Sequence, residues 1–539
     1  MKYSKYSTII VGSGIAGLYA ALKINQQVKL PDGLLLITKS KLGESNSRYA
    51  QGGMVAVLKE NKDDSTLSHI TDTIKAGAGL SELNTVKYIS ENSDAVVRDL
   101  LKFGVEFDRD ENNKLVFTME AAHSVKRILH SGGDATGKMI EQALCKAVRE
   151  HESIEISEKS MVVDVLVNSK GQCNGVVVYH EETQEYETIY TSAVVLATGG
   201  IGQLYKYTTN PIGATADGIA LGYRAGAVMQ DMEFVQFHPT ALAFDDGENR
   251  FLISEAVRGE GAKLVDADGI EFMAKYDPKK ELAPRDIVTR ANYNEMLKNN
   301  VDNVYLNATL IDKKKLAKRF PNISKTCLEH GIDITKDFIP VAPAAHYYMG
   351  GIKTNVQGET SIKGLYAIGE TSSTGLHGGN RLASNSILEC VVCAYSVANY
   401  LKSMDLKTPD KIDENIKSEI EVYENDDEIL EELDVNSLKS KLQDIMWNYV
   451  GILRNEEDLM TALEKIHSLE SEFPRNKKCL NREEYEFLNM LTVSNLIAST
   501  ALRRKESRGA HYRSDYPEKN TRCVHSCITN KDGEICFVK

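Results

Sequence analysis

Three glycines at fixed spacing near the start of the chain could hold a phosphate-containing cofactor. The motif follows an apolar run, 7–11, and reads Gly12-Ser13-Gly14-Ile15-Ala16-Gly17. In such a turn the first glycine allows a tight bend, the second lets the backbone approach a diphosphate, and the third lets the next helix pack on the strand. The helix N-terminus then offers N–H groups to the anion. The sequence therefore predicts a dinucleotide site after the first strand.

Two further small-residue turns occur much later in the chain, and each follows an apolar run. They are Ala197-Thr198-Gly199-Gly200 and Tyr366-Ala367-Ile368-Gly369-Glu370. Together with the first turn, they predict that the chain leaves one dinucleotide site and returns to it. A second predicted strand, 34–38, ends at Lys39, where NAD-binding folds usually carry an acidic residue for the ribose. A lysine at this position could bind the 2′-phosphate of NADP, but the later turns favour FAD. Lys39 then either contacts FAD or is solvated.

The composition is that of an ordinary globular protein. Of its 539 residues, 42% are apolar and 26% are charged, and this length predicts two to four domains. The net charge of −13 argues against binding to nucleic acid or to an anionic membrane surface. No apolar run is long enough to predict a transmembrane helix, and the polar N-terminus does not resemble a signal peptide, so we predict a cytoplasmic protein.

The nine cysteines are scattered along the chain, which argues against a disulfide framework. Cys390 and Cys393 lie in an apolar helical run and are interpreted as buried packing residues. The cysteines and the histidine between residues 523 and 536 lack the paired spacing of zinc ligands. We therefore predict no metal site.

These patterns predict an α/β fold with a Rossmann-like FAD-binding domain, an inserted α+β capping domain and a C-terminal helical domain. The expected bounds are 1–230 for the first part of the FAD-binding domain, 231–339 for the capping domain, 340–405 for the returning segment, 415–520 for the helical domain and 521–539 for a polar tail. The tail is expected to be loosely held. An antiparallel group of strands is expected at 161–168, 175–180 and 186–190, and helices at 67–103, 136–150 and 385–401.

Four longer motifs resemble those of the succinate dehydrogenase/fumarate reductase flavoprotein family. The first, Asn46-Ser47-Arg48-Tyr49-Ala50-Gln51-Gly52-Gly53, resembles the loop that contacts the isoalloxazine in that family. The others are Gln236-Phe237-His238-Pro239-Thr240, Glu255-Ala256-Val257-Arg258-Gly259-Glu260-Gly261, and His377-Gly378-Gly379-Asn380-Arg381 followed by Ser384-Asn385-Ser386. The resemblance runs from Thr8 to about Pro517.

This resemblance implies the contacts of a bound FAD. Beyond the first glycine motif and the loop 46–53, we expect contacts from Lys39, Val163, Asp217, Glu370, Ser386 and Ile387. The succinate dehydrogenases of the family attach FAD through a histidine five residues before the loop glutamine, here Gln51. Asn46 occupies that position, and an amide cannot form the bond. FAD is therefore expected to be non-covalent.

The resemblance also implies a substrate site for two carboxylates, which arginine suits because its fork matches a carboxylate. The expected ligands are His238, Ser254, His346 and Arg381, with Gln236 alongside. Arg285 matches the proton-transfer arginine of the family. A guanidinium is effectively never deprotonated. Pro284 predicts that Arg285 lies in the first turn of a helix, whose dipole destabilises its charge only slightly. An electrostatic role is therefore the safer expectation for Arg285.

Glu120 narrows the substrate class. It lies in Met119-Glu120-Ala121-Ala122-His123-Ser124, which resembles a segment of those family members that oxidise L-aspartate, where the glutamate faces the substrate amino group. A carboxylate there favours aspartate, which carries an ammonium, over succinate, which does not. Residues 447–454 and 506–512 also resemble segments of these members. Glu120 and Arg285 are therefore the expected catalytic residues.

The resemblance implies oxidation of L-aspartate to iminoaspartate by hydride transfer from Cα to FAD, under a capping domain that closes over the substrate. Oxygen or fumarate is the expected electron acceptor. The product is expected to enter quinolinate and then NAD synthesis, with quinolinate synthase as the candidate partner. Two alternatives are a soluble fumarate reductase or succinate dehydrogenase flavoprotein, and a non-catalytic electron-transfer flavoprotein subunit. Neither nucleic acid nor a membrane is an expected partner.

Overall fold

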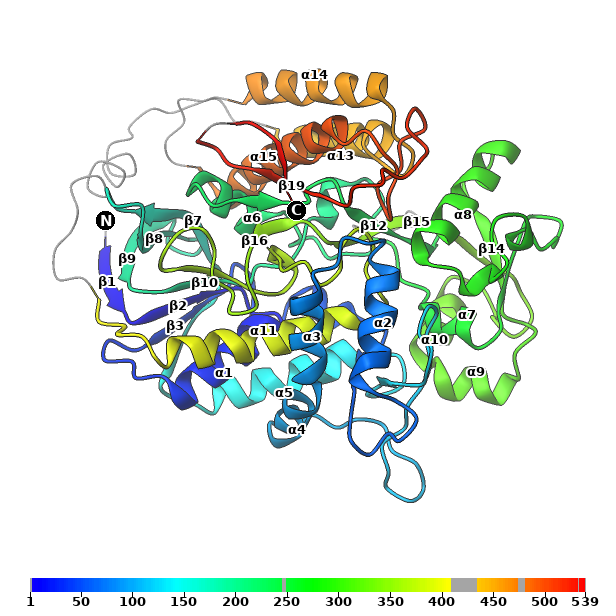
Figure 1. The fold of residues 1–539 in the computed structure, drawn as a ribbon, viewed down its shortest axis with the longest axis horizontal. Coiled ribbons are helices and arrows are strands. Elements are labelled where there is room, and N and C mark those ends of the chain that lie inside the picture. Colours follow the sequence, from blue (N-terminus) through cyan, green and yellow to red (C-terminus); the bar gives the residue numbers. More distant parts are fainter. Residues whose placement is uncertain (1, 245–248, 409–433, 474–479, 532, 539) are drawn as a thin grey trace.

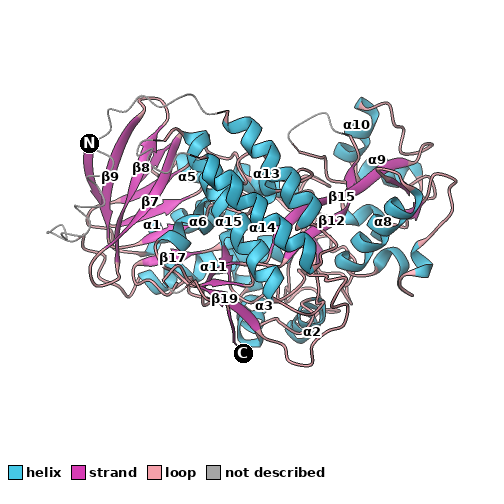
Figure 2. Ribbon diagram, turned by 90° about the horizontal axis from the view of Figure 1, so that it is seen from above, coloured by secondary structure: helices cyan, strands magenta, loops and turns pink. Residues whose placement is uncertain are grey.

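The computed structural model describes residues 2–244, 249–408, 434–473, 480–531 and 533–538. Part of the predicted helical domain, 415–433, therefore lies outside the described residues. Figures 1 and 2 show strands and covering helices at one end of the molecule and a smaller unit of strands and helices at the other. A layer of long C-terminal helices lies over the region between them. Within the described residues, the structure contains no helix long and apolar enough to cross a membrane.

A five-stranded parallel sheet forms the centre of the first domain. Its strands, in spatial order, are β17 (Leu365–Ala367), β10 (Val194–Leu196), β2 (Thr8–Val11), β3 (Leu34–Ile37) and β6 (Ile154–Ser157). The strands predicted at 7–11 and 34–38 are thus confirmed. Because β17, β10 and β2 are parallel neighbours, the three small-residue turns that follow them meet at one edge of the sheet.

The two faces of this sheet are covered differently. Ile10 and Leu36 pack with helices on one face, whereas Ile9, Leu35 and Ile37 belong to the cluster on the other. The helices are α1 (Ile15–Gln27), α5 (Thr136–Arg149) and α11 (Asn385–Leu401). On the other face lies the sheet β1 (Lys2–Tyr6), β9 (Glu185–Thr191), β8 (Cys173–His180) and β7 (Ser160–Val167). These elements confirm the predicted strand group and the helices at 136–150 and 385–401.

Shorter elements complete the domain and shape its cavities. They are α2 (Thr66–Ala76), α3 (Leu83–Glu91), α4 (Ser93–Lys102), α6 (Asp217–Arg224), the paired strands β4 (Met54–Val55) and β5 (Ile128–Leu129), and the short 3-10 helices η1 (Asn46–Tyr49), η2 (Gly202–Leu204) and η5 (Gly369–Thr371). The helices α2, α3 and α4 confirm the helical prediction for 67–103.

The cap has a sheet and a hydrophobic core of its own. Its antiparallel sheet runs β12 (Val235–Leu242), β15 (Ile339–Tyr348), β14 (Val304–Asn307) and β13 (Lys263–Val265). Around it lie α7 (Glu255–Gly259), α8 (Arg285–Asn299), α9 (Lys313–Arg319), α10 (Pro321–Glu329), η3 (Met273–Lys275) and η4 (Lys280–Leu282). The sheet continues beyond the predicted boundary at 339, because the whole of β15 pairs within it.

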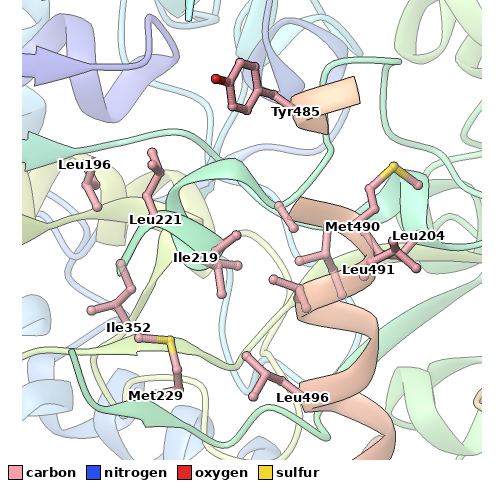
Figure 3. Packing of buried hydrophobic residues seen from close by; sticks show 14 of the residues in the cluster. Leu196, Leu204, Ile219, Leu221, Met229, Ile352, Tyr485, Met490, Leu491 and Leu496 are labelled. Atoms are coloured by element: carbon pink, nitrogen blue, oxygen red, sulfur yellow. The ribbon is translucent and has the colours of Figure 1, made fainter. Parts of the chain in front are cut away.

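The C-terminal helices share a hydrophobic core with the first domain. They are α13 (Val435–Tyr449), α14 (Glu456–Glu472) and α15 (Arg482–Arg503), and α15 begins with a capping box between Asn481 and Glu484. Figure 3 shows Met490 and Leu491 of α15 in one buried cluster with Leu204 and Ile219 of the first domain. The helical domain is therefore not an independent appendage.

The expectation of a loosely held tail was wrong. β19 (His525–Ile528) is fully buried and lies inside a sheet of order β18 (Ser372–Ser373), β16 (Gly351–Lys353), β11 (Met229–Gln230), β19 and β20 (Cys536–Val538). Nδ1 of His525 lies 2.5 Å from Oδ2 of Asp231. The polar composition of the tail suggested exposure to solvent, but its polar groups bind specific partners in segments about 300 residues earlier.

Candidate active site

A large cavity lies where the three small-residue turns meet, and we call it the cofactor cavity. It measures about 1050 Å3, including the solvent space at its open mouth. The predicted cofactor residues that line it are Gly12, Ser13, Gly14, Ile15, Ala16, Lys39, Asn46, Ser47, Asp217 and Glu370. Thr198 and Gly199, from the second turn, also line it. The turns therefore enclose a common space, as their position at one edge of the sheet requires.

The start of α1 is open toward an anion. Gly14 occupies the N-cap and provides no side-chain cap, and the first turn contains no acidic residue. Gly12 has a φ of +110°, and a Cβ on it would meet the carbonyl oxygen of Ala197 at 2.2 Å. A Cβ on Gly17 would meet the carbonyl oxygen of Gly12 at 1.9 Å. The three glycines thus let the backbone pack closely, and the start of α1, where the N–H of Ile15 donates to the Ser47 hydroxyl at 3.2 Å, faces the space for a diphosphate.

Lys39 is part of a buried ion-pair cluster rather than a solvated residue. Its Nζ lies 2.6 Å from a carboxylate oxygen of Asp217 and 2.8 Å from one of Glu486. Burial alone would lower the pKa of Lys39, but these two carboxylates outweigh that effect and raise it. Two acidic partners leave little positive charge for a 2′-phosphate, which agrees with FAD. Glu486 lies on α15, so the C-terminal domain also contacts this end of the cavity.

The loop 46–53 forms η1, which Ser45 caps by accepting a hydrogen bond from the backbone N–H of Ser47 (3.1 Å). The Ser45 hydroxyl also contacts the carboxyl group of Glu141 on α5. Glu141 is completely buried, and the burial raises its pKa to about 8. A neutral acid therefore supports the loop from behind at neutral pH.

A second cavity of about 910 Å3 adjoins the first, and we call it the substrate cavity. The two share Asn46, Ser47, Glu370 and Cys390 in their walls. The structure brings the following predicted residues to the substrate cavity: Tyr49, Ala50, Gln51, Gly52, Gly53, Glu120, His238, Ser254, Arg285, His346, Arg381, Ser386 and Ile387. Side chains from the cap and from the first domain thus meet beside the loop 46–53.

Four predicted site residues lie outside both cavity walls. Gly17 serves the packing of α1. Arg48 points back to the carbonyl oxygen of Gly43, to which its Nη1 donates at 3.4 Å. Val163 is buried within β7, and its neighbour Val162 lines the cofactor cavity instead. Gln236 lies behind the substrate cavity, fully buried, where its amide binds protein groups.

Arg285 and Arg381 provide the positive charge of the substrate cavity. Arg285 is the first residue of α8, as Pro284 predicted, and its Nε donates to a carboxylate oxygen of Glu255 at 2.5 Å. The guanidinium of Arg381 lies 4.3 Å from the ring centre of Tyr347, and its Nη1 donates to Ser386 at 3.0 Å. Burial, together with the charge of Arg285, lowers the pKa of Arg381 to about 10, so it stays charged at neutral pH.

Both histidines of the substrate cavity are neutral. Burial lowers their pKa values well below the usual range, and the charge of Arg285 adds to this effect. Nδ1 of His238 accepts a hydrogen bond from the backbone N–H of Thr240 (3.2 Å), so Nε2 carries the proton. Nε2 of His238 is buried, and no group among the described residues forms a hydrogen bond with it. A buried donor of this kind needs an acceptor, and a ligand carboxylate would provide one.

Glu120 places a carboxyl group in the same cavity as the two arginines. Its Oε2 accepts a hydrogen bond from Ser384 (2.7 Å), and Oε1 accepts one from the backbone N–H of Gly53 (3.4 Å). Burial raises the pKa of Glu120, and the nearby charge of Glu255 raises it further. A ligand ammonium would favour the charged form of Glu120.

The structure gives a place in the cavities to residues that the sequence analysis did not name individually. Glu255, Tyr347 and Ser384 line the substrate cavity, and Thr198 lines the cofactor cavity. Glu255 is the first residue of the motif 255–261, and its position 30 residues before Arg285 gave no indication that the two side chains are in contact. Tyr347 directly follows His346, and only the pairing of β15 with β12 reveals that it faces Arg381.

This arrangement can bind a small diacid beside an extended dinucleotide. Two arginines and the neutral His238 offer donors for two carboxylates, and Glu120 offers an acceptor for a cation. The adjoining cavities would bring that diacid next to the group held by the loop 46–53. The residue set therefore suits flavin chemistry on an amino diacid.

Comparisons of the sequence with known proteins agree with this geometry. Residues 7–387 match the family described as FAD binding domain, and residues 439–536 match the family described as fumarate reductase flavoprotein C-term. The chain is similar to the L-aspartate oxidase of Acinetobacter baylyi, with 42% identity over 98% of this chain and 97% of the relative. It is also similar to the L-aspartate oxidase of a Nostoc species, with 40% identity over 97% of this chain and 93% of the relative.

Solved structures show the same fold. A variant of quinol fumarate reductase from E. coli aligns with a TM-score of 0.91 and 30% identity, and the alignment covers 100% of this chain and 97% of that one. An Sdh1 structure from Mycobacterium smegmatis aligns with a TM-score of 0.83 and 30% identity, covering 100% of this chain and 94% of that one. The predicted fold, a Rossmann-like FAD-binding domain with a cap and a helical C-terminal domain, is thereby confirmed.

Proposed function

We propose that this chain, which belongs to the L-aspartate oxidase family of FAD-binding flavoproteins, oxidises L-aspartate to iminoaspartate with FAD as its cofactor. The identity of about 40% to relatives named L-aspartate oxidase extends over nearly the whole chain. This supports an FAD-dependent oxidoreductase over a non-catalytic electron-transfer subunit.

One observation carries the choice of substrate: a carboxyl group, Glu120, lines the same cavity as Arg285 and Arg381. The arginines and His238 suit any C4 diacid. Glu120 has no use for succinate or fumarate, since it would face a CH2 or CH group there, and a buried carboxylate without a cationic partner is costly. L-Aspartate supplies that partner as its ammonium.

The residues of the cofactor cavity fit FAD held without a covalent bond. Gly12 and Gly14 at the start of α1 would hold the diphosphate, and the loop 46–53 with Glu370 would hold the flavin ring. Asn46 lies 3.4 Å from Glu370 through its Nδ2, and an amide at this position cannot attach the flavin. FAD, when bound, supplies the acceptor for the hydride that leaves Cα.

The side chains of the substrate cavity would then have separate roles. Arg381, His346 and His238 bind the two carboxylates, and Arg285 with Ser254 completes the set. Glu120 binds the ammonium and takes its proton, because the nitrogen needs a lone pair to form the C=N bond as Cα loses hydride. Arg285 acts through its positive charge, and its Nε and Nη1 donate to Glu255 and Gln236, which fix its position. The cap excludes water from the closed cavity.

The fate of the electrons and of the product completes the proposal. Oxygen or fumarate takes the electrons, and fumarate carries the two carboxylates that the arginines bind, although it offers Glu120 no cation. Iminoaspartate is the starting point of quinolinate and NAD synthesis in this family. We therefore propose that this is the first step of that route and that quinolinate synthase, which consumes the product, is the functional partner.

The test is anaerobic mixing of the purified yellow protein with L-aspartate or with succinate. We expect L-aspartate to bleach the flavin absorption band, whereas succinate should shift the band slightly on binding without bleaching it. Admitting oxygen should restore the band and produce hydrogen peroxide, and adding fumarate under nitrogen should restore it without peroxide. Bleaching by succinate in preference to L-aspartate would identify a succinate dehydrogenase-type enzyme instead, and a colourless protein would contradict the whole proposal.

A further inference from the structure

Behind the substrate cavity, two side-chain amides connect both arginines to an acidic residue. Oε1 of Gln236 accepts hydrogen bonds from Nη1 of Arg285 (3.0 Å) and from Nε of Arg381 (3.3 Å). Nε2 of Gln236 donates to Oδ1 of Asn380 (3.0 Å) and to the backbone carbonyl oxygen of Arg381 (3.0 Å). Nδ2 of Asn380 in turn donates to Oδ1 of Asp286 (3.2 Å). We call Gln236, Asn380 and Asp286 the amide relay.

The charges at its two ends set the direction of every hydrogen bond in the amide relay. An amide presents an acceptor oxygen on one side and a donor NH2 group on the other, whereas a guanidinium only donates. Gln236 must therefore turn its oxygen toward the arginines, and its NH2 group then needs an acceptor. Asn380 provides its oxygen only when its own NH2 group also meets an acceptor. The Asp286 carboxylate accepts and cannot donate, so it orients Asn380, whose oxygen then faces the NH2 group of Gln236.

Asp286 is itself held by Arg290, one turn further along α8. Nη2 of Arg290 donates to Oδ2 of Asp286 at 3.0 Å, and Nη1 donates to the carbonyl oxygen of Gly509 at 3.1 Å. The Arg290 guanidinium also lies 5.2 Å from the ring centre of Tyr512. The outer end of the amide relay is thus fixed between the cap and the C-terminal domain, away from the substrate.

From this geometry we propose that Asp286 is a positioning residue for the oxidation. It keeps the oxygen of Gln236 toward Arg285 and Arg381 and so sets the angle at which they meet the substrate carboxylates. This inference rests on the proposed function, because it takes the two arginines as the carboxylate ligands. When Asp286 is neutral, Asn380 can turn around and point its NH2 group at the NH2 group of Gln236, which pushes the Gln236 amide away from the arginines. The arginines separate from Gln236, while the cofactor cavity is unchanged.

The test is Asp286→Asn, measured with the FAD-loaded full-length enzyme. We expect kcat/KM for L-aspartate to fall at least about tenfold, since a displacement near 1 Å at a binding group can cost more than that. The dissociation constant of succinate, read from the change it causes in the flavin spectrum, should rise by a similar factor. FAD content should stay the same. Asp268→Asn, which neutralises an exposed aspartate of the cap, is the matched control and should change neither quantity.

A double variant can show whether Asp286 acts by orienting the amides or merely by providing one contact. Asp286→Asn combined with Asn380→Asp restores an acceptor for Nε2 of Gln236 one residue closer to the arginines. We expect this double variant to recover kcat/KM and succinate binding to within about threefold of the unmodified enzyme. A single variant that behaves like the unmodified enzyme, or a double variant no better than Asp286→Asn, would overturn the proposal.

Asn380→Ala breaks the amide relay at its middle and covers the case in which Asp286→Asn does not fold. It should weaken succinate binding about tenfold at unchanged FAD content. Normal succinate binding by this variant would also overturn the proposal. The succinate measurement needs no turnover, so it remains informative even if L-aspartate fails to reduce the flavin, a result that contradicts the proposed function alone.

Discussion

The cofactor cavity and the substrate cavity adjoin each other but are built in different ways. The cofactor cavity is formed largely by backbone and small residues that follow neighbouring parallel strands of one sheet. The substrate cavity is formed by charged and aromatic side chains from the cap and from the first domain, with Arg285 and Arg381 nearly 100 residues apart. The first depends on where the chain runs, whereas the second depends on which side chains it presents.

This difference has a physical reason. A diphosphate can be bound by main-chain N–H groups, which every residue but proline carries, so shape is the main requirement. Distinguishing one diacid from another requires charges at defined positions, and the cap can bring these to the ligand only when it is closed. Substitutions should therefore separate the two cavities: backbone crowding should affect FAD binding, and side-chain changes should affect substrate selection.

Loss of Arg381 should give the largest effect on substrate handling. For Arg381→Met we expect kcat/KM for L-aspartate to fall about a hundredfold to a thousandfold, because a buried carboxylate loses its charged partner. FAD affinity should change less than about twofold, as a flavin titration of the apoprotein would measure. Arg109→Met, at an exposed arginine, is the control. A parallel loss of FAD binding would show that the two cavities are not separable.

Crowding of the first glycine turn should have the opposite effect, weakening FAD binding rather than substrate selection. In Gly12→Ala the new Cβ meets the carbonyl oxygen of Ala197 at 2.2 Å, so the turn after β2 must shift. We expect FAD affinity to fall about a hundredfold, from the combined steric overlap and unfavourable φ. Gly171→Ala, also at a positive φ but with no atom within 4 Å of its Cβ, controls for backbone strain alone. Equal effects of the two variants would contradict the explanation by crowding.

Removal of the charge of Glu120 should change the preference between L-aspartate and succinate without changing FAD binding. In Glu120→Gln we expect the preference for L-aspartate over succinate to fall about tenfold or more, because the hydrogen bond to the ammonium loses its charge. The measurement is the ratio of flavin reduction rates with the two substrates. An unchanged ratio would remove Glu120 from substrate recognition.

The smallest effect should come from Glu141, beneath the loop that both cavities share. Its pKa in the folded protein, about 8, lies above the ordinary value of 4.5. The folded protein thus keeps a proton that the unfolded chain releases, and stability should fall as pH rises from about 4.5 to about 8. Glu141→Gln should lessen this fall, by a few degrees in Tm at pH 8. An identical pH profile of Tm in both proteins would contradict the assignment.

Much of the fold and the cofactor site could be predicted because their signals are local. The turn after β2 and the helix α11 follow from a few consecutive residues, and the structure has both as expected. The partners of Lys39 could not be predicted in this way, since Glu486 approaches it from a helix almost 450 residues later. The role of Gln236 was also beyond local patterns, because its burial behind the arginines depends on how β12 packs against the loop of Arg381. The prediction for the tail was wrong for the same reason, because His525 and Ser526 bind buried acidic residues that lie about 300 residues earlier.

The position of β19 has a consequence for how this protein is made. β11, at residues 229–230, needs β19, at 525–528, as its neighbour in the sheet. While the ribosome is still synthesising the C-terminal helices, one edge of β11 therefore lacks its strand partner. The segment that leads into the cap is not yet anchored on that side. The sheet around β11 can therefore be completed only after residues 525–528 have emerged.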